Sequence, residues 1–167
     1  AMIQPYREVN EPQAMCDMVD HFCQNSNDKA IFIADRGYES LNVFAHVIEN
    51  RSNFLIRAKD VGGKTNILST LNLPDEDEFD VDIRRYLTRR LSKKMKEQPN
   101  VYKHISNRSF DYIEQGSKNL YYIGFRVLRF KISDDSYECI ITNLPREDFS
   151  MEDMKHIYNL RWGIETS

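Results

Sequence analysis

The chain has 167 residues, of which 41% are hydrophobic and 29% are charged, and its formal net charge is −3. This composition is typical of one folded domain with a proper core, and it excludes a disordered chain. No run approaches the roughly 18 apolar residues of a membrane span and no signal peptide opens the chain, so we expect a cytoplasmic protein without a membrane partner.

Cysteine count, charge and chain ends set further bounds. The three cysteines are too few and too scattered for a disulfide framework, which indicates a reducing compartment. The negative net charge does not indicate nucleic acid, but it leaves it open, because binding follows local patches. Ala1 before Met2 indicates a cloning remnant, and the chain stops at Ser167 inside a helical pattern. We therefore expect a fragment of a longer protein.

The first part of the chain alternates helical and strand patterns. Apolar residues at helical spacing predict a helix over residues 12–24, with Pro12 suited to its first turn. A short buried strand over 29–35 follows, then a helix over 40–50 and a second strand over 53–59. The order helix, strand, helix, strand predicts an α/β layer with parallel strands.

Residues 60 to about 118 break this alternation. An acidic stretch leads into a helix predicted over residues 81–97. Acids at its start and bases at its end suit a helix dipole, so the basic residues can form a solvated face; the alternative is a phosphate-binding surface. The bases concerned are Arg84, Arg85, Arg89, Arg90, Lys93, Lys94 and Lys96.

A hairpin and a final helix complete the predicted elements. The stretch "NLYYIGFRVLRFKI" alternates apolar residues on one face, and "SYECIITNL" pairs with it across the turn "SDDS". Ser150 followed by Asp153 is a capping-box pattern that predicts a helix start near Ser150.

One face of this last helix carries three functional side chains at helical spacing: Tyr158, Arg161 and Glu165. A solvated face with an Arg–Glu pair explains the same pattern. An adjacent stripe of apolar residues is expected to pack on the sheet: Ile157, Leu160 and Ile164.

Asp35 directly follows the strand "IFIA", where it either forms a turn or presents a metal ligand. The order of "ADRGY", "FLIRAK", "TNLP" and then Tyr, two residues, Arg, three residues and Glu bears on this choice. It resembles the DDE transposases of bacterial insertion sequences, in particular the cut-and-paste group with a Tyr-Arg-Glu-Lys signature. The resemblance runs from about Pro5 to the end of the chain, and it favours the metal ligand.

The resemblance implies an RNase H-like α/β core, incomplete at its N-terminus, with a mixed helical and β insertion between the second and third acidic residues. The core would comprise residues 1–59 and 143–167, and the insertion residues 60–142, with a basic helix and a β-hairpin. Asp35 matches the second catalytic Asp and Glu165 the catalytic Glu, and both would bind metal.

The resemblance also implies partners for the other matched residues. Tyr158, Arg161, Arg57 and Lys59 would hold DNA, both transposon ends and target. Two Mg²⁺ or Mn²⁺ ions bound by carboxylates suit phosphodiester cleavage, so histidine and cysteine need not take part. We interpret the histidines as structural or surface residues. A homodimer on paired DNA ends is expected, associated with the nucleoid when bound to DNA.

The sequence departs from the family pattern at both ends. No residue before Asp35 has the context of the first catalytic Asp, and the signature Lys would fall beyond Ser167. We therefore expect an inactive fragment of a transposase that nicks DNA and transfers strands. A non-catalytic DNA-binding or assembly module from a degenerate or domesticated transposase is the alternative, and an RNase H-like nuclease that only hydrolyses is a third hypothesis.

Overall fold

The structure is a computed structural model that describes residues 10–105 and 109–162. Helices and strands alternate in its first part, as the sequence predicts, and strands dominate its second. The elements in chain order are α1 (Glu11–Asn25), β1 (Ile31–Ala34), the 3-10 helix η1 (Arg36–Tyr38), α2 (Leu41–Glu49), β2 (Asn53–Ala58), the 3-10 helix η2 (Ile67–Thr70), β3 (Phe79–Thr88), α3 (Lys93–Lys96), β4 (Tyr102–His104), β5 (Tyr121–Ser133), β6 (Ser136–Thr142) and α4 (Met151–Arg161).

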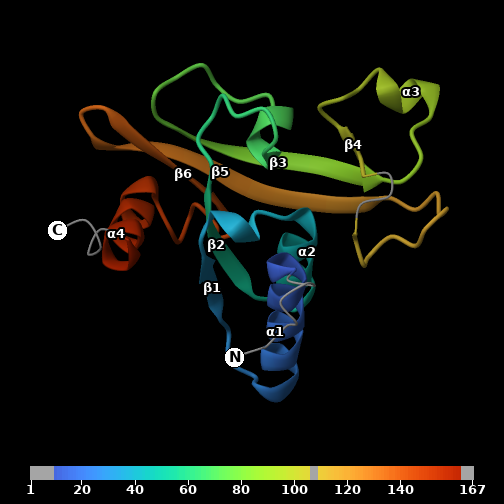
Figure 1. Ribbon diagram of the computed structural model, residues 1–167, viewed down its shortest axis with the longest axis horizontal. Coiled ribbons are helices and arrows are strands. Elements are labelled where there is room, and N and C mark those ends of the chain that lie inside the picture. Colours follow the sequence, from blue (N-terminus) through green and yellow to red (C-terminus); the bar gives the residue numbers. More distant parts are fainter. Residues whose placement is uncertain (1–9, 106–108, 163–167) are drawn as a thin grey trace.

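The strands of the described residues form one mixed sheet in the order β1-β2-β6-β5-β3-β4 (Figure 1). β1 and β2 are parallel, as a strand–helix–strand unit requires, and β3 and β4 are also parallel. The inner pairs are antiparallel, including the long β5–β6 hairpin that the alternating pattern predicts. The α/β class is therefore confirmed.

Strand pairing bears on the predicted division into core and insertion. β6 belongs to the segment assigned to the insertion, yet it pairs with β2 of the assigned core, with Leu55 opposite Thr142. Both segments thus contribute to the same continuous sheet. The boundaries at residues 60 and 143 stay a prediction.

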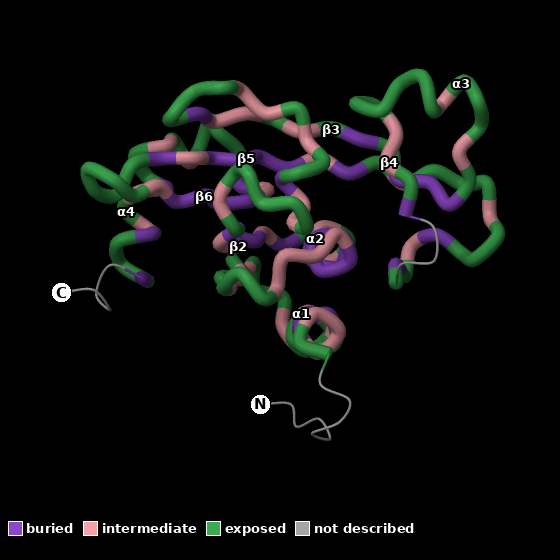
Figure 2. The backbone as a smooth tube through the Cα atoms, turned by 45° about the horizontal axis from the view of Figure 1, so that its top comes forward, coloured by how far each residue is buried: buried purple, intermediate pink, exposed green. Residues whose placement is uncertain are grey.

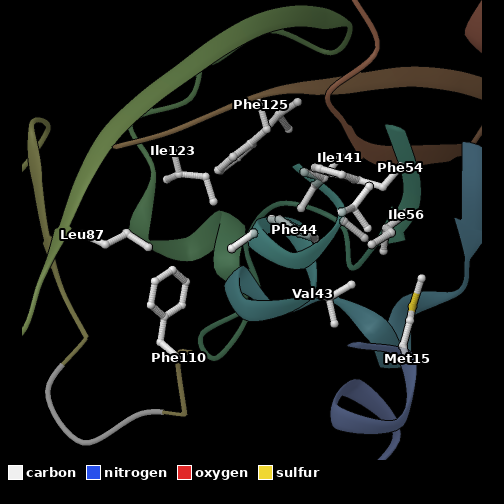
Figure 3. Packing of buried hydrophobic residues seen from close by; sticks show 14 of the residues in the cluster. Met15, Val43, Phe44, Phe54, Ile56, Leu87, Phe110, Ile123, Phe125 and Ile141 are labelled. Carbon is white, nitrogen blue, oxygen red and sulfur yellow. The ribbon is translucent and has the colours of Figure 1, made fainter. Parts of the chain in front are cut away.

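Two hydrophobic clusters cover the opposite faces of this sheet. Successive side chains of a strand point to opposite faces, so Val127 of β5 joins the cluster under α1 and α2, while Leu128 joins the cluster under α4. Figure 3 shows the first cluster, in which Phe44 of α2 stacks on Phe54 of β2 at 4.6 Å between ring centroids. Buried residues follow the central strands and α2, whereas α3 is largely exposed (Figure 2).

The helix predicted over residues 81–97 is wrong: the first part of this segment, up to Thr88, lies in β3, and only the four residues of α3 are helical. Apolar side chains at Phe79, Val81 and Ile83 alternate with charged ones, which is the period of two that a strand requires. Pairing with β5 along nine residue positions then fixes the strand. The prediction instead followed the charge order along the segment.

Because β3 is a strand, its bases do not share one face. Arg84 is exposed, whereas Arg85 is buried. Arg89 is also buried and donates hydrogen bonds to the carbonyl oxygens of Ile113 and Phe110, at 2.8 and 2.9 Å. The basic segment is therefore neither a continuous solvated helix face nor a continuous phosphate-binding one.

α4 begins at the predicted capping box, in which the Ser150 hydroxyl accepts from the Asp153 N–H and the Asp153 carboxylate accepts from the Ser150 N–H. Its predicted apolar stripe is wrong in part. Leu160 is 60% exposed and Ile157 only partly buried, while Ile164 lies outside the described residues. The buried stripe is Met154, Tyr158 and Trp162, because the two aromatic rings, four residues apart, offer the larger area to bury.

Within the described part of the chain, no helix combines the length and the apolar character that crossing a membrane requires.

Candidate active site

Asp35 leaves the sheet at the carboxyl end of β1, at the start of η1. Its backbone is extended and its carboxylate makes no hydrogen bond that caps η1. The side chain is 53% exposed, and its contact is with Nη1 of Arg57 on the neighbouring β2, at 3.3 Å. The backbone of Asp35 thus starts the turn, where its carbonyl accepts from the Tyr38 N–H, while its carboxylate stays exposed to solvent beside Arg57.

Glu138 on β6 is the centre of the charged group behind Asp35, and the sequence analysis missed it. Its side chain is 2% exposed, and both oxygens accept from Nε of Arg57 at 3.1 Å. Nη2 of Arg36, the residue after Asp35, bonds to the same carboxylate. One buried carboxylate therefore joins η1, β2 and β6. The signal for it was a single acid inside the otherwise uncharged strand "YECIIT".

Arg57 links the carboxylates of Asp35 and Glu138 to α4. Its guanidinium carbon lies 6.0 Å from the ring centroid of Tyr158 and 5.8 Å from that of Trp162. Hydrogen bonds to Glu138 raise the pKa of Arg57 despite its partial burial. Burial and the charge of Glu138 likewise raise the pKa of Tyr158. The group thus keeps a positive guanidinium and a neutral phenol beside Asp35.

The structure brings together three of the predicted site residues: Asp35, Arg57 and Tyr158. Arg161 lies further along α4, with its guanidinium carbon 5.7 Å from the centroid of the Trp162 ring. Lys59 is exposed just after β2 and lines a separate cavity. Glu165 lies outside the described residues.

The segment "TNLP" joins β6 to β2. The Thr142 hydroxyl donates to the Phe54 carbonyl. The Asn143 side chain accepts from the Phe54 N–H at 2.8 Å and donates to the Ser52 carbonyl at 3.0 Å. These bonds hold the start of β2, the strand that carries Arg57, against the end of β6, so the segment supports the site rather than lining it.

His46 supports the structural interpretation of the histidines. It is buried in α2, with Nδ1 2.9 Å from Asp20 and Nε2 2.7 Å from Asp111. Both ring nitrogens are therefore engaged within the fold. Cys16, Cys23 and Cys139 are free thiols, and burial raises the pKa of Cys16 and Cys139 to about 12, so neither is a thiolate at neutral pH.

Metal ligands are sparse within the described residues, where no group of three His, Cys, Asp or Glu side chains could hold an ion. Asp35 nevertheless has the chemistry that a hard divalent cation takes, an exposed carboxylate with one oxygen outside its contact with Arg57. Glu138 does not, because both of its oxygens are held by arginines.

The comparison with protein families assigns the chain to a class. The family model of the transposase DDE domain matches residues 2–167, so the chain belongs to the DDE transposase domain family. Its mixed sheet with helices on both faces is consistent with the RNase H-like fold. This family generally uses divalent metal ions and acts on DNA. A comparison with curated proteins found no match.

Proposed function

We propose that this chain is part of the catalytic domain of an insertion-sequence transposase of the Tyr-Arg-Glu-Lys group. The protein would cleave DNA at the ends of the element and join the 3′-hydroxyl to target DNA. The observation that carries the proposal is the exposed Asp35 carboxylate at the carboxyl end of β1, beside a cation and the α4 helix. Asp35 and Glu165 would be the catalytic, metal-binding carboxylates of this chain.

Each residue near Asp35 has a separate task in this proposal. Mg²⁺ or Mn²⁺, held by Asp35 and Glu165 as a pair of ions, would activate the attacking oxygen and stabilise the leaving one. Arg57 contacts Asp35 and is itself held by Glu138, so it would orient the carboxylate and add positive charge for the DNA backbone. Tyr158 and Arg161 would bind the backbone near the cleaved end, with α4 docked by the buried Tyr158 ring.

The assembly is part of the same proposal. Cutting two ends of one element requires two active sites, for which a homodimer on paired DNA ends is the simplest arrangement. The protein would be cytoplasmic and associate with the nucleoid when bound to DNA. Two of the acids required by the chemistry are assigned to this chain, so we expect cleavage only when a third carboxylate completes the site.

The test is DNA cleavage by the full-length protein that contains this chain. With Mg²⁺ or Mn²⁺ and the terminal repeats as substrate, Asp35→Asn and Glu165→Gln should each lower the rate about a hundredfold or more, since a lost metal ligand removes several kcal/mol of transition-state stabilisation. Asp28→Asn removes another exposed carboxylate, just before β1, and serves as the matched control. Cleavage by Asp35→Asn at the wild-type rate would refute the assignment.

The same experiment separates the alternative, a non-catalytic DNA-binding or assembly module. The ion pair between Arg57 and Asp35 supports this alternative, because the guanidinium balances the charge of the carboxylate without a metal ion. Such a module would bind the terminal repeats as tightly after Asp35→Asn as before, and it would cleave them with neither metal. Metal-dependent cleavage by the unaltered protein excludes it.

A further inference from the structure

A cavity of about 370 Å³ lies between the loop that follows β2 and the face of β3 and β5. Apolar side chains from the sheet, among them Ile123 and Phe125, form part of its wall. Its charged lining is almost entirely basic. The cations come from five separate places along the chain: Arg36, Lys59, Lys64, Arg85 and Lys103.

The acidic residue of the lining, Glu39, is held by backbone N–H groups and forms no described ion pair with these cations. One of its oxygens accepts from the Lys59 backbone N–H at 3.3 Å, and the other from the Ile67 N–H at 3.0 Å. Glu39 thereby holds the two ends of the loop that carries Lys64. Within the described residues, no carboxylate pairs with the side chains of Lys59 or Lys64.

Arg85 is the most informative residue of the cavity. It is only 7% exposed, and its guanidinium donates to a single described acceptor, the Thr70 carbonyl of η2, at 3.2 Å. No described carboxylate pairs with it, and burial alone lowers its pKa. The guanidinium nitrogens of Arg85 that make no hydrogen bond within the described residues are not fully buried, and Arg85 lines the cavity. They are therefore available to pair with an anion there, and the low exposure of the side chain would strengthen that pair.

We propose that this cavity binds a phosphate group of a nucleic-acid strand, with Arg85 in its wall and Lys59 and Lys64 at its rim. A phosphate suits the site because arginine forms paired hydrogen bonds with its oxygens and lysine adds mobile positive charge. Arg36 lines the cavity and also bonds to Glu138, so the site adjoins the group around Asp35. The choice of nucleic acid as the source of the phosphate rests on the proposed function; the anion site itself does not.

The test uses this chain in EDTA, so that binding is measured without catalysis. Pyrophosphate is titrated by calorimetry to probe the anion site, and a fluorescent single-stranded oligonucleotide is titrated by anisotropy to probe the strand. Lys64→Gln and Arg85→Gln should each weaken both interactions about tenfold, as expected for loss of one charge-assisted hydrogen-bonding partner. Lys118→Gln, an exposed lysine outside the cavity, is the matched control and should change neither interaction.

Salt and backbone chemistry identify the strand. Lys64→Gln should lower the slope of log affinity against log salt by about one for the oligonucleotide. An oligonucleotide with uncharged methylphosphonate linkages should not compete for the site. If pyrophosphate binding is lost in both variants while oligonucleotide binding is unchanged, the cavity is a site for a free anion and the nucleic-acid assignment is overturned.

Other outcomes are equally decisive. If pyrophosphate binds wild type and both variants alike, or binds none of them, the cavity is not an anion site. Because Lys64 is exposed, its variant tests binding even if Arg85→Gln lowers the stability of the fold. The cleavage test of Asp35 is independent of these results. Cleavage by the full-length protein, when this chain binds no phosphate in the cavity, overturns only the present inference. Absence of cleavage by the full-length protein, when this chain does bind phosphate, overturns only the proposed activity.

Discussion

At the scale of single residues, Glu138 holds the proposed active site together. Its carboxylate is shared by Arg36 from η1 and Arg57 from β2, and Arg57 in turn contacts Asp35. Both arginines reach solvent in part, but Glu138 itself does not. Its charge is therefore tolerable inside the sheet only because two cations meet it there.

Glu138→Gln tests this role, because it keeps the side-chain shape and removes the charge. We expect the free energy of unfolding to fall by about 2 kcal/mol, less than for a fully buried unpaired ion because Arg36 can turn to water. Urea denaturation measures the change. Asp134→Asn, at a fully exposed carboxylate in the β5–β6 turn, is the control and should cost less than about 0.5 kcal/mol. Equal losses in the two variants would contradict the shared-carboxylate role.

Some residues of the proposed active site could be placed from the sequence, and others could not. Asp35 and Tyr158 could be placed because a strand end and a helical spacing are local patterns. Arg57 could be placed on its strand, but not beside Glu138, because that contact joins residues far apart in sequence. The sequence groups Lys59 with Arg57, but Lys59 follows the end of β2 and lines the basic cavity instead of the group around Asp35. Contacts between distant segments depend on strand order, which local patterns do not determine.

At the scale of elements, His46 connects three segments. It lies on α2, between Asp20 of α1 and Asp111 of the loop before β5. Burial opposes its charge, but hydrogen bonds with the two carboxylates outweigh it, so the pKa of His46 rises above its ordinary 6.5. Hydrogen bonds from Asn42, and then from His46, lower the pKa of Asp111 below its ordinary 3.8.

The stabilisation by this cluster should therefore depend on pH. A raised histidine pKa stabilises the fold fully below 6.5, and the stabilisation is lost as pH rises through the folded-state pKa. The lowered pKa of Asp111 stabilises the fold above pH 3.8, and this stabilisation is lost as pH falls through the folded-state pKa. The difference in unfolding free energy between wild type and His46→Gln should thus be greatest between these values and shrink toward alkaline pH. His21→Gln, at an exposed histidine of α1, should show no such trend.

Helices and strands could be predicted where the hydrophobic periodicity agreed with the residues that mark their ends. α1, α2, β2 and the β5–β6 hairpin lie where their patterns place them. β3 was missed because the dipole-like order of its charges outweighed its alternation, although pairing with β5 is what stabilises it. On α4 the helical period was predicted correctly, but the wrong face was expected to be buried. Which face packs on the sheet depends on the shape of the sheet surface, which the sequence of the helix does not specify. The sheet accepts Tyr158 and Trp162 beside Phe130.

At the scale of the whole molecule, charge is segregated rather than uniform. The two acids within β3 are engaged with arginines: Asp80 contacts Arg126 at 2.7 Å and Arg146 at 2.8 Å, and Asp82 contacts Arg146. Lys59, Lys64 and Arg85, which pair with no carboxylate among the described residues, lie instead around the cavity beside η2. A net charge of −3 is thus compatible with a local site for phosphate, since the lining of the cavity holds five basic residues and one acidic residue, Glu39.

The two hydrophobic clusters should unfold together, because they share the strands between them. β5 contributes Val127 to one and Leu128 to the other, so the loss of either cluster removes packing from the same strand. Fluorescence of the single tryptophan, Trp162, reports the α4 side, and far-UV circular dichroism reports the whole sheet and all helices. Both signals should give the same midpoint in urea, as a two-state domain requires.

A core substitution on the buried side of α4 makes this test of shared unfolding specific. Met154 is fully buried, so Met154→Ala should lower the free energy of unfolding by about 2–4 kcal/mol and shift both signals equally. Leu160 is on the exposed side of the same helix, and Leu160→Ala should change it by less than about 0.5 kcal/mol. If Met154→Ala moved only the Trp162 signal, α4 would unfold as a separate unit. The helix carrying Tyr158 and Arg161 would then be free to dock and undock while the sheet holding Asp35 stayed folded.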